Sequence, residues 1–192
     1  MSTTPAGVRP RSIGHVGLIA HDLERSVGFY ESVLGMQVSD RMQFPPGHRF
    51  RDGVWLRCNA EHHVISIFDL RQPETPGPSV ARAGQAGVHH IAFEMSSVED
   101  LRRLARHAQA NDIEIEGMRT GGPGVQLRLY IWDPDDNIVE LFWAMDKVGW
   151  DGRTRPFPPV TPIELESFDV DAWLAMKGSE FTTEPMAGAL AR

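Results

Sequence analysis

The sequence predicts an α+β fold of two tandem β-α-β-β-β modules, which form one curved, mixed sheet around a metal cleft with the helices outside. Two observations predict this class. Strand-like and helix-like segments follow the same order twice along the chain, and residues 14–18 align with residues 89–93. One such module is too small to bury its own sheet face, so two copies are expected to share a core.

Composition limits the classes of partner. The chain has 192 residues, a net charge of −7, one cysteine and a hydrophobic content of 41%. A single cysteine cannot form an internal disulfide, and an acidic chain without a dense Lys/Arg run offers no phosphate-binding surface. No segment approaches the roughly 18 apolar residues of a membrane span. We therefore expect a cytoplasmic protein with no nucleic-acid and no membrane partner and, by analogy at the level of the fold, a homo-oligomer.

The first module is expected at residues 12–70, after a flexible arm at residues 1–11. Asp22 can cap a helix that Gly35 ends, and the apolar residues between them recur at helical spacing. Short runs rich in β-branched and aromatic residues predict the strands of the module. These strands are expected at residues 13–19, 36–42, 54–58 and 63–68.

The second module repeats this order at residues 87–146, after a linker at residues 71–86 that is rich in Pro, Gly and Ala. Ser96 or Ser97 can cap its helix at residues 98–111. Its strands are expected at residues 88–95, 113–118, 125–132 and 137–143. The modules together would form a single catalytic domain at residues 12–146. A proline-containing extension at residues 147–192 follows, with a short helix near residues 169–177.

Three side chains suited to metal binding fall at related positions of the repeat. His15 and His90 occupy the same place on the first strand of each module, and Glu140 aligns with Ser66 on the last strand. Two imidazoles and one carboxylate leave coordination positions open, as in non-haem Fe(II) enzymes that activate O₂. Taken singly, His15 is more typical of a structural histidine than of a ligand, and Glu140 could face solvent. Their joint placement favours a metal site, because an unpaired buried carboxylate is costly.

The sequence resembles the vicinal oxygen chelate superfamily, which includes glyoxalases, bleomycin resistance proteins and extradiol dioxygenases. Within it, the chain is most similar to one-domain type I extradiol catechol dioxygenases of the dihydroxybiphenyl-cleaving kind. The resemblance runs from about residue 13 to residue 155. Its matching segments are Gly14-His15-Val16, residues 29–36, the Asn-x-x-His-His run at residues 59–63, Val88-His89-His90, and Tyr130 placed ten residues before Glu140.

The resemblance implies a ring-cleaving dioxygenase that uses Fe(II), with Mn(II) as the alternative metal, and O₂ to open a catecholic substrate, biaryl or bicyclic catechols included. It implies that His15, His90 and Glu140 hold the metal. It also implies that His63 is the acid–base histidine, with His62 as the fallback, a task that suits an imidazole titrating near neutral pH. Tyr130 would hydrogen-bond the substrate or oxygen.

One segment departs from the family pattern, and two other functions stay open. Residues 120–124 read Thr-Gly-Gly-Pro-Gly and lack the His and Asn that dihydroxybiphenyl-cleaving members carry there, so the substrate is not fixed. A metal-dependent isomerase or lyase of the glyoxalase or epimerase type is the first alternative, although such enzymes usually place a carboxylate or further ligand where Ser66 stands. A non-enzymatic small-molecule-binding resistance protein is the second, although such proteins usually lack the metal ligands.

Overall fold

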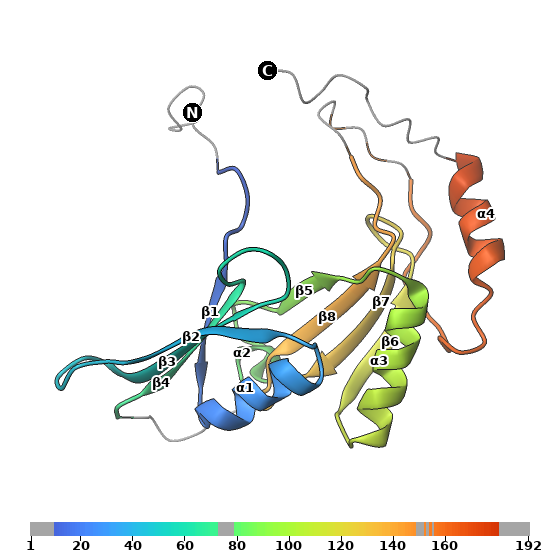
Figure 1. The fold of residues 1–192 in the computed structure, drawn as a ribbon. Helices are drawn as coiled ribbons and strands as arrows, with labels where there is room; N and C mark the ends of the chain where they lie inside the picture. Colours follow the sequence, from blue (N-terminus) through green and yellow to red (C-terminus); the bar gives the residue numbers. More distant parts are fainter. Residues whose placement is uncertain (1–9, 73–78, 149–151, 153, 155, 181–192) are drawn as a thin grey trace. The chain divides into compact units, whose positions relative to one another are not determined.

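A computed structural model describes residues 10–72, 79–148, 152, 154 and 156–180 of the chain. The protein divides into two compact units, Met1–Gly77 and Pro78–Arg192 (Figure 1). Most of the arm expected at residues 1–11, and parts of the expected linker and extension, lie outside the described residues.

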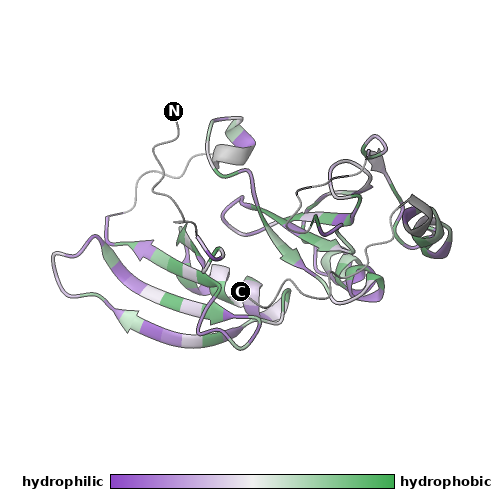
Figure 2. Ribbon diagram, turned by 90° about the horizontal axis from the view of Figure 1, so that it is seen from above, coloured by the Kyte–Doolittle hydropathy of each residue, from purple (hydrophilic) through white to green (hydrophobic). Residues whose placement is uncertain are grey.

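The first unit is a four-stranded sheet with one helix on it. Its elements are β1 (Val16–Ala20), α1 (Leu23–Ser32), β2 (Gln37–Gln43), β3 (Phe50–Arg57) and β4 (Ile65–Leu70). The strand order is β1-β4-β3-β2, with β1 parallel to β4 and the other pairs antiparallel. Hydrophilic and hydrophobic residues alternate along the strands (Figure 2), as expected for a sheet with one face on the core.

The capping predicted for α1 is confirmed. The Asp22 carboxylate accepts a hydrogen bond of 3.1 Å from the Arg25 backbone N–H, and Gly35 follows the helix at a φ of +65°. The helix buries Val27 and Tyr30 against the sheet. The signals that begin and end this helix are therefore local, while burial of its apolar side places it on the sheet.

The second unit repeats the arrangement with two additions. Its elements are α2 (Val80–Ala83), β5 (His90–Glu94), α3 (Val98–Ala110), β6 (Ile115–Thr120), β7 (Leu127–Trp132), β8 (Ile138–Trp143), β9 (Thr161–Pro162) and α4 (Val170–Glu180). The strand order is β5-β8-β7-β6-β9, with β5 parallel to β8. Ser97 caps α3, whose buried side packs on β6, β7 and β8. That side consists of the predicted residues Leu101, Leu104, Ala105 and Ala108.

The α+β class and the repeated β-α-β-β-β order are confirmed, with one difference. The sequence predicts a single curved sheet, whereas the described strands form two sheets, one in each unit. The physical reason is that the first strand of each module pairs with the last strand of the same module, so the described strand pairs all lie within one unit. The register follows the repeat, since Ser66 lies opposite Gly17 and Glu140 lies opposite the aligned Ala92.

The segment after β8 is attached to the second unit. β9 adds an edge to the sheet through Thr161 and Pro162, which pair with the end of β6. The Lys177 ammonium group on α4 donates to the Val125 carbonyl at 2.6 Å and to the Ala144 carbonyl. It also lies 2.7 Å from the Asp146 carboxylate. Within the described residues, no helix combines the length and the apolar character that a membrane crossing requires.

Candidate metal centre

Glu140 is the buried acid of the second unit. It lies in the middle of β8 and is 3% exposed. Its Oε1 accepts a hydrogen bond of 2.9 Å from the Gln126 side-chain amide, and its Oε2 lies 3.2 Å from His90 Nε2. The alternative that Glu140 faces solvent is therefore wrong. A carboxylate removed from water needs such partners, because burying it unpaired is costly.

Tyr130 lies directly opposite Glu140 on β7. Burial raises the pKa of Tyr130 to about 12, and its hydrogen bond to Glu140 and the negative charge of that carboxylate add to the effect. Its ring stands edge-on to His90, with the ring centroids 5.9 Å apart. Tyr130 is therefore a neutral hydrogen-bonding group that contacts both predicted metal ligands of this unit.

His90 is the first residue of β5, and its two ring nitrogens have different partners. Nδ1 lies 2.8 Å from Nδ1 of His89, while Nε2 points toward Glu140. Metal-binding histidines commonly coordinate through one nitrogen while a second group orients the other. Two ligands held at roughly 2.1 Å from one ion and at right angles are about 3 Å apart, which the separation of His90 Nε2 and Glu140 Oε2 matches. The donors of this unit therefore fit a divalent metal.

The first unit brings together His15 and His63. The ring centroids are 4.5 Å apart, and His15 lies one residue before β1 rather than within the strand. His63 Nδ1 lies 2.9 Å from His62 Nδ1. Burial lowers the pKa of His63 from its ordinary value, and the neighbouring His15 and His62 lower it further. Ser66, the repeat equivalent of Glu140, is buried in β4.

The predicted site residues thus form two pairs within the units, His90 with Glu140 and His15 with His63. Among the described residues, no group of three His, Cys, Asp or Glu side chains could hold a metal ion. The full ligand set takes residues from both units and stays a prediction. Gln126 was missed by the sequence reasoning, because an amide at the start of a strand carries no repeat signal.

The loop that departs from the family pattern is covered by the chain after β8. The Gly122 N–H donates to the Pro158 carbonyl at 2.8 Å, and Gly121 has a φ of +78°. A Cβ on Gly121 would lie 2.2 Å from the Pro159 carbonyl oxygen. Only glycine allows both this conformation and this close approach, so the two glycines provide space for the residues that follow.

The chain has the fold class of two β-α-β-β-β modules, and its second unit holds a buried carboxylate beside an imidazole. Residues 12–141 match the Glyoxalase/Bleomycin resistance protein/Dioxygenase superfamily, and the chain belongs to this family. A domain of that description from Frankia sp. EAN1pec has the same fold, with a TM-score of 0.59 and 18% identity over 70% of this chain and 98% of that one.

Two of the relatives are named as dioxygenases. The chain is 28% identical over 139 residues to a manganese-dependent 2,3-dihydroxybiphenyl 1,2-dioxygenase of Geobacillus genomosp. 3, covering 70% of this chain and 37% of that protein. It is 34% identical over 98 residues to an iron-dependent extradiol dioxygenase of Rhodococcus jostii (strain RHA1), covering 47% of this chain and 29% of that protein. The chain therefore spans only about a third of the length of these two relatives.

Proposed function

We propose that this protein is an extradiol ring-cleaving dioxygenase that opens a catecholic substrate with O₂. The observation that carries the proposal is the Glu140 carboxylate, which is buried, lies 3.2 Å from His90 Nε2 and contacts Tyr130. An imidazole and a carboxylate that converge in this way favour a divalent metal. The names of the two dioxygenase relatives support the choice of reaction.

The proposed metal ligands are His15, His90 and Glu140, and the proposed metal is Fe(II), with Mn(II) as the alternative. One relative is named for manganese and the other for iron, so the family uses both. The metal would supply coordination positions at which a catechol and O₂ meet.

The side chains around the metal would position the substrate and move its protons. Tyr130 keeps its proton at neutral pH, because burial and Glu140 raise its pKa to about 12, so its hydroxyl can donate to a substrate oxygen. Burial and neighbouring histidines keep His63 neutral, so its imidazole can accept a proton from the catechol hydroxyl and later return it. Gln126 fixes the direction of the carboxylate.

The test starts from protein purified without oxygen, in which bound iron and manganese are measured. Addition of 2,3-dihydroxybiphenyl or catechol with O₂ is expected to give a yellow ring-fission product and stoichiometric O₂ uptake. No product from either catechol with iron or manganese loaded would refute the proposal. Turnover of methylglyoxal and glutathione with nickel or zinc would instead support the lyase alternative.

Variants separate the proposed roles. His90→Ala should lose bound metal, whereas His63→Ala should retain the metal and slow turnover. His107→Ala is the matched control, because His107 lies on the exposed side of α3. Full metal content in His90→Ala would contradict the ligand assignment.

A further inference from the structure

Two arginines face each other across the sheet of the second unit. Arg119 on β6 lies directly opposite Arg128 on β7. Alternate residues of β7 point to opposite faces, and Leu127, Leu129 and Ile131 are fully buried on the side that α3 covers. Arg128 therefore shares the other face with Tyr130. Like charges in directly opposed positions destabilise a sheet, so an anion beside this pair of arginines would be stabilising.

Arg119 has a carboxylate of its own. Its Nη1 and Nη2 lie 2.5 Å and 2.7 Å from the two oxygens of Glu116. Its guanidinium carbon lies 5.2 Å from the centre of the Tyr130 ring. The charge of Arg119 is therefore largely neutralised within the protein, while its position beside Tyr130 is fixed.

Arg128 has no such partner among the described residues. Its Nη2 donates to the Gly121 carbonyl at 2.8 Å, and this is the hydrogen bond that holds the side chain. Its Nε is buried without a hydrogen-bond partner, and no described carboxylate forms an ion pair with it. A buried donor without a partner is rare in folded proteins. Within the part of the chain that the structure describes, the positive charge at this point of the face therefore has no carboxylate beside it.

We propose that Arg128, flanked by Arg119, binds a carboxylate carried by the substrate, so that the substrate class is a catechol with an acidic side chain. This inference rests on the function proposed above. Arg128 is two residues from Tyr130, which is a step of about 7 Å along a strand. A catechol that uses its hydroxyl groups beside Tyr130 and Glu140 would place a ring substituent in this direction. A planar guanidinium group suits a carboxylate because the two can form paired hydrogen bonds.

The first measurement compares matched substrates. The metal-loaded protein is assayed with 3-(2,3-dihydroxyphenyl)propanoate and with its neutral amide. The acid is expected to have a kcat/KM at least about tenfold higher. Arg128→Gln should remove most of that preference, measured as the ratio of kcat/KM for acid and amide, and Arg128→Lys should restore part of it. Equal kcat/KM for acid and amide in the wild-type protein would overturn the inference.

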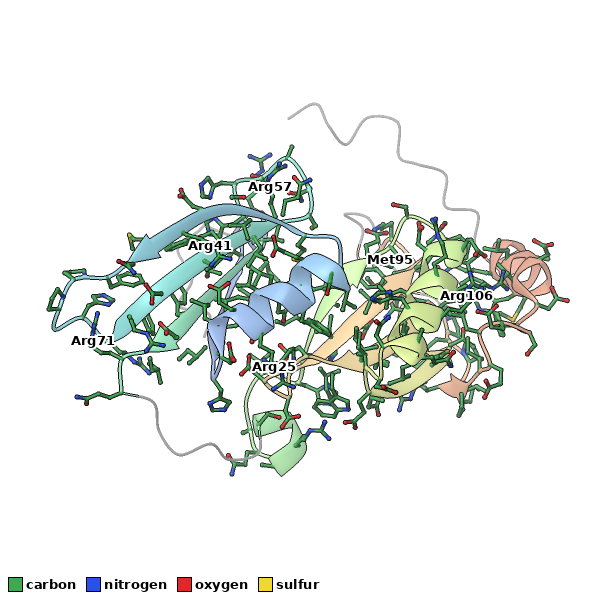
Figure 3. The ribbon with its side chains drawn as sticks, turned by 60° about the horizontal axis from the view of Figure 1, so that its bottom comes forward. Arg25, Arg41, Arg57, Arg71, Met95 and Arg106 are labelled. Carbon is green, nitrogen blue, oxygen red and sulfur yellow. The ribbon has the colours of Figure 1, made fainter. Side chains whose placement is uncertain are left out.

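The second measurement does not depend on turnover. Binding of 3-phenylpropanoate, which has no catechol hydroxyls, is compared with binding of 3-phenylpropanamide by calorimetry on the metal-free protein. The acid should bind at least about tenfold more tightly, and Arg128→Gln should abolish the difference. Arg25→Gln is the control, because Arg25 (labelled in Figure 3) is an exposed arginine on α1.

The two measurements separate failure of the inference from failure of the proposed function. Binding of the acid that depends on Arg128, with no ring cleavage of any catechol, would support the acidic-ligand site and reject the dioxygenase. Cleavage of neutral catechols with no effect of Arg128→Gln on either ligand would support the dioxygenase and reject the acidic substrate.

Discussion

Replacement of Gly121 by alanine tests the contact between the loop at residues 120–124 and the chain that follows β8. Gly121 has a φ of +78°, and its carbonyl oxygen accepts the hydrogen bond from Arg128. An added Cβ would lie 2.2 Å from the Pro159 carbonyl oxygen and 3.0 Å from its carbon. Both are backbone atoms, so a change of side-chain rotamer cannot relieve the overlap.

The expected loss of stability has two parts. The left-handed conformation costs an alanine about 1–2 kcal/mol. Relief of the overlap requires Pro159 to move by about 1 Å, which would strain or break the hydrogen bond from Gly122 to the Pro158 carbonyl, worth about 0.5–1.5 kcal/mol. We therefore expect Gly121→Ala to lower the free energy of unfolding by about 1.5–3.5 kcal/mol.

Urea denaturation followed by circular dichroism measures this loss, with Gly84→Ala as the matched control. Gly84 belongs to the same unit and has a φ of +64°, but a Cβ there would have no atom within 4 Å. The control therefore carries the conformational cost alone, about 1–2 kcal/mol. An equal loss in the two variants would refute the close approach of Pro159 to Gly121.

Three further changes test the supports around the site and the second unit. Gln126→Leu should weaken metal binding about tenfold to a hundredfold in a chelator competition, because Glu140 loses the donor that orients it; unchanged affinity would contradict that role. Lys177→Met should cost about 1.5–3 kcal/mol in urea, because the charged donor to the Val125 carbonyl is lost, and an unchanged urea midpoint would show that Lys177 does not hold α4. Ser97→Ala should cost about 1 kcal/mol by removing the cap of α3. The Ser97 hydroxyl, and then Arg103, lower the pKa of Asp100. The stabilisation by Ser97 is therefore present above the ordinary carboxyl pKa and is lost as the pH falls through the lowered pKa of Asp100. A stability difference between wild type and Ser97→Ala that does not shrink in acid would contradict this.

The elements that local chemistry defines were predictable from the sequence. Asp22 and Ser97 cap α1 and α3 as expected, because a side-chain oxygen before a periodic apolar run is a local signal. Strand ends were less predictable. β3 begins at Phe50, before the predicted strand at residues 54–58, because pairing with β2 and β4 rather than local propensity extends it.

The repeat predicts which residues of the two modules occupy equivalent strand positions, but it does not predict their side-chain partners. It aligned Glu140 with Ser66, and the strand pairing places them opposite the aligned Ala92 and Gly17. The supports of Glu140 are not repeated. Gln126 reaches it from the residue just before β7, so its role depends on the path of the loop at residues 121–126 rather than on the repeat.

Arg128 illustrates the same limit in terms of charge. Read along the sequence, it is one more arginine in an apolar strand, which is typical of a solvent-exposed position. Its significance depends on three neighbours from other segments: Arg119 opposite it, Gly121 holding it, and Glu116 neutralising the other arginine instead. The free energy of an unpaired charge is set by these contacts, none of which a strand pattern encodes. Repeat-equivalent positions such as Ser66 and Glu140 can therefore be predicted from sequence, whereas the surroundings of Arg128 depend on tertiary contacts.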